Sequence, residues 1–94
     1  MYLKIESQEH LDSLTAEELA KVKFINMSDT DVSDISALSN CKELIWVWAG
    51  FTKISDLSAL ANCKELRALV LRHTNVSDIS ALANCIDLRY IINV

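Results

Sequence analysis

The 94-residue sequence predicts an α/β fold: a short solenoid of about five parallel strands, with short helical or 3-10 connections and an N-terminal helical cap. Two observations predict it. First, three segments align at a spacing of 22 residues: VSDISALSNCKEL from Val32, ISDLSALANCKEL from Ile54 and VSDISALANCIDL from Val76. Second, apolar residues alternate over short stretches with the same period, as in a half-buried strand.

The strands follow from stepping the stretch 66–76 along the chain in units of 22 residues. The inward pairs are Leu3 and Ile5, Ile25 and Met27, Val47 and Ala49, Leu69 and Leu71, and Ile91 and Asn93. Only Asn93 breaks the apolar pattern. Parallel strands are therefore expected near residues 2–6, 24–28, 46–50, 68–72 and 90–93.

Each strand is expected to lead through a turn into a short helical return on the convex side. A Ser–Asp pair stands where the return needs an N-cap, because its oxygens can accept backbone N–H groups. These pairs are Ser33–Asp34, Ser55–Asp56 and Ser77–Asp78. An Asn at the far end tolerates the left-handed backbone that ends a helix. These residues are Asn40, Asn62 and Asn84.

Residues 7–21 replace the first return with a more helical stretch. Thr15 and Glu18 form a capping-box pattern, and leucines at helical spacing supply an apolar face. The chain is thus expected to be one leucine-rich domain, 1–94. Its parts are the strand and cap 1–21, the repeats 22–43, 44–65 and 66–87, and the truncated final repeat 88–94. No equivalent cap is expected after the last strand.

The stretch LRALVLRHTNV from Leu66 to Val76 follows the pattern LxxLxLxxNxL, with Thr74 where Asn is commoner. Over residues 22–94 the sequence resembles leucine-rich repeat proteins, in particular the bacterial, internalin-like subclass with 22-residue repeats. The resemblance implies strands on a concave face and threonines in the role of the family's Asn ladder. Since such repeats serve many unrelated recognition tasks, the resemblance implies no particular target.

Composition excludes several classes of function. The chain has no apolar run long enough to span a membrane, and its net charge of −4 disfavours nucleic acid and anionic membranes. The start MYLKIESQEH lacks the regions of a signal peptide, so a cytoplasmic location is expected. An odd number of cysteines suits reduced thiols. They are Cys41, Cys63 and Cys85.

The residues that could carry chemistry do not assemble into a site. The cysteines recur with the repeat and no histidine lies at ligand spacing, so they are interpreted as core spacers. His10 and His73 have no nucleophile or carboxylate set beside them by the repeat, and Gly50 is the only glycine. We therefore expect no enzyme activity, no cofactor and no metal.

The outward-facing columns of the sheet carry the strongest functional signal. The first column is Tyr2, Phe24, Trp46, Ala68 and Tyr90. The second column is Lys4, Asn26, Trp48, Val70 and Ile92. The third column is Glu6, Ser28, Gly50 and Arg72, with Val94 if the last strand continues. Five of the six aromatic residues fall in the first two columns, and Phe51 follows the third strand. Solvated positions would instead resemble the Lys–Glu pairs of the convex turns.

Such a patch is typical of a protein-binding face, because aromatic residues and arginine dominate interface energetics. Basic residues are expected to cluster around Val70 and Tyr90, which would fit a partner with an apolar ridge and an acidic border. The proposed partner-binding residues are Phe24, Trp46, Trp48, Phe51, Arg67, Val70, Arg72, His73, Arg89, Tyr90 and Ile92.

The sequence is therefore interpreted as a protein-interaction module, either a small adaptor or an inhibitor that occludes its target. Three other readings stay open. The tryptophans can simply shield a thin sheet. The chain can self-associate, as a homodimer, through its last strand or its apolar face. Aromatic stacking can also bind single-stranded nucleic acid, although the negative net charge makes nucleic acid an unfavourable partner.

Overall fold

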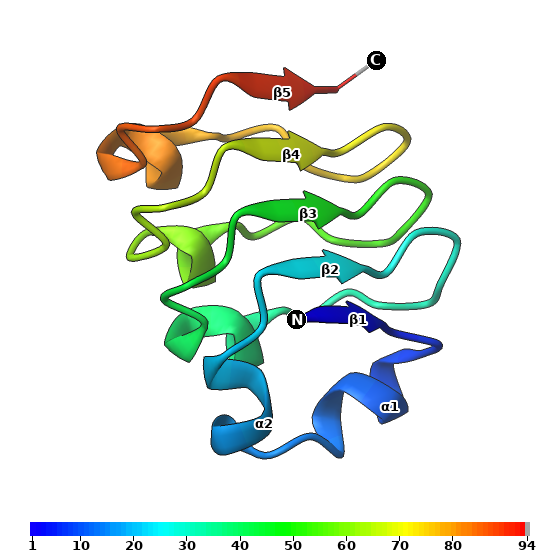
Figure 1. Cartoon of the computed structure of the whole chain (residues 1–94). Coiled ribbons are helices and arrows are strands. Elements are labelled where there is room, and N and C mark those ends of the chain that lie inside the picture. The colour runs from blue at the N-terminus through cyan, green and yellow to red at the C-terminus, as the bar shows by residue number, and fades with distance from the viewer. Residues whose placement is uncertain (94) are drawn as a thin grey trace.

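A computed structural model describes residues 1–93, which coil into a short solenoid (Figure 1). Val94, which the third outward column would include, lies outside these residues. The strands are β1 (Tyr2–Lys4), β2 (Phe24–Asn26), β3 (Trp46–Trp48), β4 (Ala68–Val70) and β5 (Tyr90–Ile92). The helices are α1 (Gln8–Asp12) and α2 (Ala16–Ala20), and the 3-10 helices are η1 (Ser36–Asn40), η2 (Ser58–Leu60) and η3 (Ser80–Asn84). Among residues 1–93, no helix is long and apolar enough to cross a membrane.

The five strands form one parallel sheet in the order β1-β2-β3-β4-β5. Each strand pairs with the next at an offset of one repeat, so that Phe24 lies beside Trp46. This confirms the predicted fold class. The helical segments stack in a second column beside the strands, beginning with α2 under η1 (Figure 1).

The strands are shorter than predicted, with three residues each. The ladder continues one residue further, since the Met27 amide donates to the Trp48 carbonyl at 2.8 Å. The chain then turns through a left-handed residue, Asp29, with φ of 59°. The third outward column therefore lies in the turn, and the predicted strand ends were wrong by up to two residues.

The residues with a left-handed backbone conformation lie in the turns that follow the strands. Phe51 and His73 have φ of 59° and 54°, at the positions equivalent to Asp29. The prediction that Asn would adopt this conformation at the end of each return was wrong. Asn40 and Asn84 are instead the last residues of the 3-10 helices η1 and η3. The tight reversal is needed where the chain leaves the sheet, and there even bulky residues adopt it.

The predicted caps are confirmed in part. Thr15 and Glu18 form a complete capping box at α2. In the first return, the Asp34 carboxylate accepts the Ser36 amide hydrogen bond at 2.8 Å, whereas no side-chain cap bond comes from Ile35, the residue directly before η1. The aspartate two positions before the first helical residue thus closes an Asx turn at the start of the helix. The Asp56 and Asp78 carboxylates do the same in the next two returns.

The interior is a column of apolar side chains between the strands and the returns. Cys41, Cys63 and Cys85 are buried in it as unpaired thiols, as core spacers would be. Thr52 is buried, and its hydroxyl donates to the Ala49 carbonyl at 2.8 Å. Thr30 and Thr74 make the equivalent bonds. Each threonine thus satisfies a backbone carbonyl of its own turn, three residues earlier in the chain, whereas the ladder role that the resemblance implies would join neighbouring turns.

The N-terminal end of the interior is closed by α1 and α2, which bury Leu11 and Leu19. Gln8 ties this cap to the first return. Its side-chain carbonyl accepts from the amides of Ser33 and Asp34 at 2.8 and 2.9 Å.

Candidate functional site

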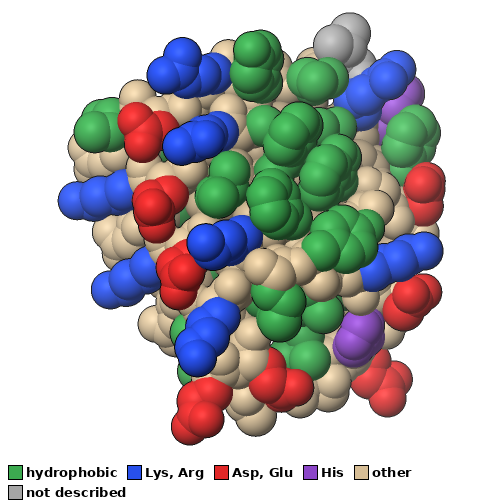
Figure 2. All heavy atoms as spheres, in the orientation of Figure 1, with side chains coloured by type: hydrophobic (Ala, Val, Ile, Leu, Met, Phe, Trp, Pro, Cys, Tyr) green, Lys and Arg blue, Asp and Glu red, His purple; other side chains and the backbone are tan. Residues whose placement is uncertain are grey.

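The sheet presents its outward columns as one continuous face. Strand pairing sets Tyr2, Phe24, Trp46, Ala68 and Tyr90 side by side across the five strands. Figure 2 shows that hydrophobic side chains gather at the centre of this face, over β3, β4 and β5, with charged side chains on both flanks. The predicted aromatic residues are thus brought together on one surface.

Three of the aromatic rings contact one another. The rings of Trp46 and Trp48 are stacked, with centroids 5.0 Å apart and planes at 11°. Tyr2 meets Trp48 edge-on at 6.4 Å and 63°, although their strands are separated by β2. Tyr2 was not among the predicted binding residues. The sequence feature that could have identified it is its place in the first outward column.

The exposure of these rings differs from the core. Trp46 is 38% exposed, whereas Val47, the inward residue of the same strand β3, is buried. On the last strand, β5, Tyr90 is 63% exposed and the inward residue Ile91 is 40% exposed. Phe24, Trp48 and Val70 are half-buried, and Ile92 is exposed. These side chains lie on the sheet rather than in it, so they do not fill the interior of the solenoid.

A shallow hollow opens at the C-terminal half of the face. Its volume is about 200 Å³, and every residue that lines it is apolar or aromatic. The lining residues are Trp46, Ala68, Leu69, Val70, Tyr90 and Ile92. Sequence reasoning missed Ala68 as a site residue. The signal was present, because it is the one small residue in a column of aromatic ones.

The turns after β3 and β4 form one edge of the face. The rings of Phe51 and His73 stack with centroids 4.5 Å apart. A Cβ placed on Gly50 would lie only 3.3 Å from the Arg72 carbonyl oxygen. Glycine thus permits the close approach of these two turns, which brings Phe51 and His73 into contact.

The predicted basic cluster is divided between two borders. Arg67 and Arg89 precede β4 and β5, whereas Arg72 and His73 follow β4. All four side chains are exposed. These residues therefore flank β4 and β5, the strands that carry Val70 and Tyr90, from both ends. The apolar centre lies between the two basic borders.

Among residues 1–93, no group of three or more His, Cys, Asp or Glu side chains is placed so that it could hold a metal ion. Burial raises the pKa of the Cys41 thiol to about 11 and that of Cys63 to about 12, so both are protonated at neutral pH. These thiols are poor ligands and poor nucleophiles in the folded chain.

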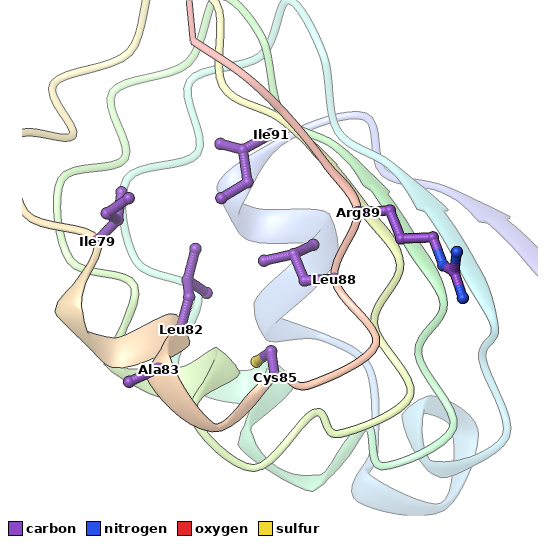
Figure 3. Close-up of a pocket in the computed structure, with 7 residues that line it drawn as sticks. All are labelled: Ile79, Leu82, Ala83, Cys85, Leu88, Arg89 and Ile91. Carbon is purple, nitrogen blue, oxygen red and sulfur yellow. The ribbon is translucent and has the colours of Figure 1, made fainter.

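The C-terminal end of the solenoid is open. Ile79, Leu82, Leu88 and Ile91 point toward one another around a depression of about 420 Å³, whereas Arg89 points away (Figure 3). Ile79 is 46% exposed, but its counterpart Ile35 in the first repeat is 4% exposed. Each earlier turn is covered by the next one, so this end exposes side chains that are buried elsewhere in the chain.

Two solved structures are similar to this chain. Internalin C2 from Listeria monocytogenes shares 30% sequence identity, with a TM-score of 0.75, over 78% of this chain and 32% of its own. An internalin (inlF) from the same species shares 28% identity, with a TM-score of 0.66, over 93% of this chain and 36% of its own. No protein-family profile and no curated protein sequence matches the chain. The chain spans about a third of the length of these two structures.

Proposed function

Starting from its internalin-like leucine-rich repeat fold, which is a protein-interaction fold, we propose that this chain binds a partner protein through the aromatic face of its sheet. Bound there, it acts as a small adaptor or as an inhibitor that occludes its target. The cytoplasm is the proposed compartment, since three unpaired thiols suit reducing conditions.

The observation that carries the proposal is the set of aromatic rings on the outward face, in which Trp46 is stacked on Trp48 and Tyr2 meets Trp48 edge-on. Large aromatic rings supply most of the binding energy at protein interfaces. Here they are held in place before any partner arrives, which lowers the entropic cost of binding. A shield for the sheet would need only aliphatic cover and no ordered stack of rings.

Binding rather than catalysis is proposed because the hollow on the outward face of the sheet is lined by apolar and aromatic side chains, which suit recognition. The histidine beside the face, His73, stacks on Phe51. The other histidine, His10, accepts the Glu6 amide hydrogen bond through Nδ1 at 3.0 Å in the cap. Each imidazole thus makes a local contact that is not a hydrogen bond to a nucleophilic side chain.

A selection from a random twelve-residue peptide library against the immobilised protein tests the proposal. Enriched peptides are then titrated against the wild-type protein and against Trp46→Ala. Losing this ring is expected to weaken binding by a factor of about 30 to 1,000, the equivalent of about 2–4 kcal/mol. Lys42→Ala on the convex turn is the matched control and should leave the affinity unchanged. Equal binding by Trp46→Ala and wild type, with both folded, would overturn the proposal.

A second candidate function is self-association through the open C-terminal end. The exposure of Ile79 and Ile91, at 46% and 40%, favours it, because side chains at equivalent positions are buried in earlier turns. Light scattering across a concentration series measures it. A concentration-dependent dimer that Ile91→Asp converts to monomer would support this candidate, and a monomer throughout would exclude it.

A further inference from the structure

We infer that the hollow over Ala68 receives one apolar side chain of the partner protein, and that a carboxylate next to this side chain pairs with Arg67 and Arg89. The inference rests on the proposed function and names the kind of segment that the face recognises: an apolar residue flanked by Asp or Glu.

The hollow is a gap in the first outward column of the sheet, which is otherwise made of aromatic rings. Trp46, Ala68 and Tyr90 are aligned on β3, β4 and β5. Strands in a sheet are about 4.8 Å apart, so the backbones under Trp46 and Tyr90 are separated by about 10 Å. Apolar groups in contact approach to about 4 Å. The gap therefore accommodates a single inserted side chain between the two rings.

The chain does not fill this gap with its own rings. Trp48 contacts Tyr2 across β2, so the ring of Trp48 leans toward β1 and away from β4. Trp46 is stacked on Trp48 and is held on the same side. Ala68 is 2% exposed at the bottom of the hollow, below the walls formed by its larger neighbours.

The apolar lining of the hollow favours an apolar side chain of the partner. All six lining residues are apolar or aromatic, and the hollow measures about 200 Å³. An apolar cavity of about 150 Å³ is large enough to bind benzene. A phenyl or a branched aliphatic side chain matches this size and would displace water from a surface that offers it few hydrogen bonds.

The arginines beside the hollow determine which group of the partner can lie next to the inserted side chain. Arg67 and Arg89 immediately precede Ala68 and Tyr90, and the Arg89 amide donates to the Arg67 carbonyl at 2.9 Å, so the two residues lie on neighbouring rungs. Figure 2 shows basic side chains nearest to the apolar patch on that flank, with acidic ones farther out. Two guanidinium groups one strand apart suit a carboxylate, which accepts paired N–H bonds.

The peptides selected against the wild-type protein test the inference first by their sequence. We expect the enriched sequences to share an aromatic or branched aliphatic residue with Asp or Glu within two positions. A basic consensus, or one without an apolar residue, would overturn it. A single-stranded oligonucleotide that competes for the same face would also overturn it, because the carboxylate would then be the wrong partner.

Variants of the hollow provide the second test. Ala68→Phe places a ring in the hollow and makes the first outward column aromatic throughout. The variant should fold, because the equivalent position is aromatic in the other four strands. It is expected to weaken peptide binding at least tenfold. Tyr90→Ala should also weaken binding, whereas Lys42→Ala on the convex turn is the control and should leave the affinity unchanged. Unchanged affinity in Ala68→Phe would overturn the inference.

Charge reversal provides the third test. The double variant Arg67→Glu, Arg89→Glu is expected to weaken binding at least tenfold, with the loss shrinking in high salt. The control, Lys42→Glu with Lys64→Glu, makes the same change in net charge on the convex turns and should have little effect. The two proposals are separable: loss of binding in Trp46→Ala with full binding in Ala68→Phe would retain the face and reject the hollow.

Discussion

The indole rings of Trp46 and Trp48 lie 5.0 Å apart and within 11° of parallel, although both residues belong to the short strand β3. Residues two apart on a strand share a face, and their Cα atoms are about 6.6–6.8 Å apart. The rings have therefore moved toward each other to reach stacking distance. The result is a flat apolar plate on the exposed side of the sheet.

The stack should contribute measurably to stability. Aromatic pairs are worth about 0.5–1.5 kcal/mol beyond the area that they bury. A double-mutant cycle with Trp46→Ala and Trp48→Ala, followed by urea unfolding, is expected to give a coupling energy in this range. Trp48→Ala should be the more destabilising single change, since Trp48 also contacts Tyr2. Strictly additive effects would show that the rings do not stabilise each other.

Equivalent isoleucines should differ in their effect on stability according to their place along the solenoid. Ile35 is 4% exposed and Ile79 is 46% exposed. Ile35→Ala removes fully buried atoms and is expected to cost about 2–5 kcal/mol, whereas Ile79→Ala should cost about 1 kcal/mol or less. Chemical unfolding of the two variants measures the difference. Equal costs would mean that the last turn is covered as well as the first.

Stability should decrease in acid because of the Asx turns. Hydrogen bonds from Ser36, Ser58 and Ser80 hold the pKa of the preceding aspartates below the usual 3.8. Groups with a lowered folded pKa stabilise the folded state above the unfolded value, and this contribution is lost as the pH decreases through the folded value. The free energy of unfolding is therefore expected to decrease below about pH 4.

The triple variant Asp34→Asn, Asp56→Asn, Asp78→Asn isolates this effect. Asn can accept the same backbone hydrogen bond but does not titrate, so the turns remain and the acid dependence becomes shallower. Glu18 retains its own contribution, because its pKa is also lowered by its bonds with Thr15. An unchanged slope between about pH 4 and pH 2 in the triple variant would contradict the assignment.

The cysteines should be unreactive in the folded chain. Burial raises the pKa of Cys41 and Cys63 to about 11 and about 12, and it also raises the pKa of Cys85. At pH 8 a disulfide reagent is expected to label none of them quickly, and Cys85 should react first because it lies in the last turn. Denaturant should expose all three. Rapid labelling of Cys63 in native buffer would contradict its place in the core.

Much of the fold was predictable because the repeat fixes it. A 22-residue period with paired apolar positions has one packing solution, and each strand lies where the period places it. The ends of the strands were less predictable. Asp29, Phe51 and His73 adopt a left-handed backbone, and nothing in the local preference of Phe indicates that conformation.

The sequence predicted which residues share the outward face of the sheet, but not the shape of the surface that they form. Alternation alone places Trp46 and Tyr90 on the same face. The direction in which each side chain leans depends on its neighbours across the sheet, as the contact between Tyr2 and Trp48 shows. That direction decides that a hollow opens over Ala68. The division of the arginines between two borders was already implied by the sequence, because Arg67 precedes β4 and Arg72 follows it.

The emission of the two tryptophans is the most direct test of the proposed binding face. The chain contains only Trp46 and Trp48, so its indole fluorescence reports on this face alone. On titration with a selected peptide, we expect the tryptophan emission to shift to the blue and to become protected from quenching by acrylamide. Both changes should have the same midpoint in peptide concentration as the heat of binding measured by calorimetry. A complex that forms by calorimetry, yet leaves emission and quenching unchanged, would show that the partner binds elsewhere.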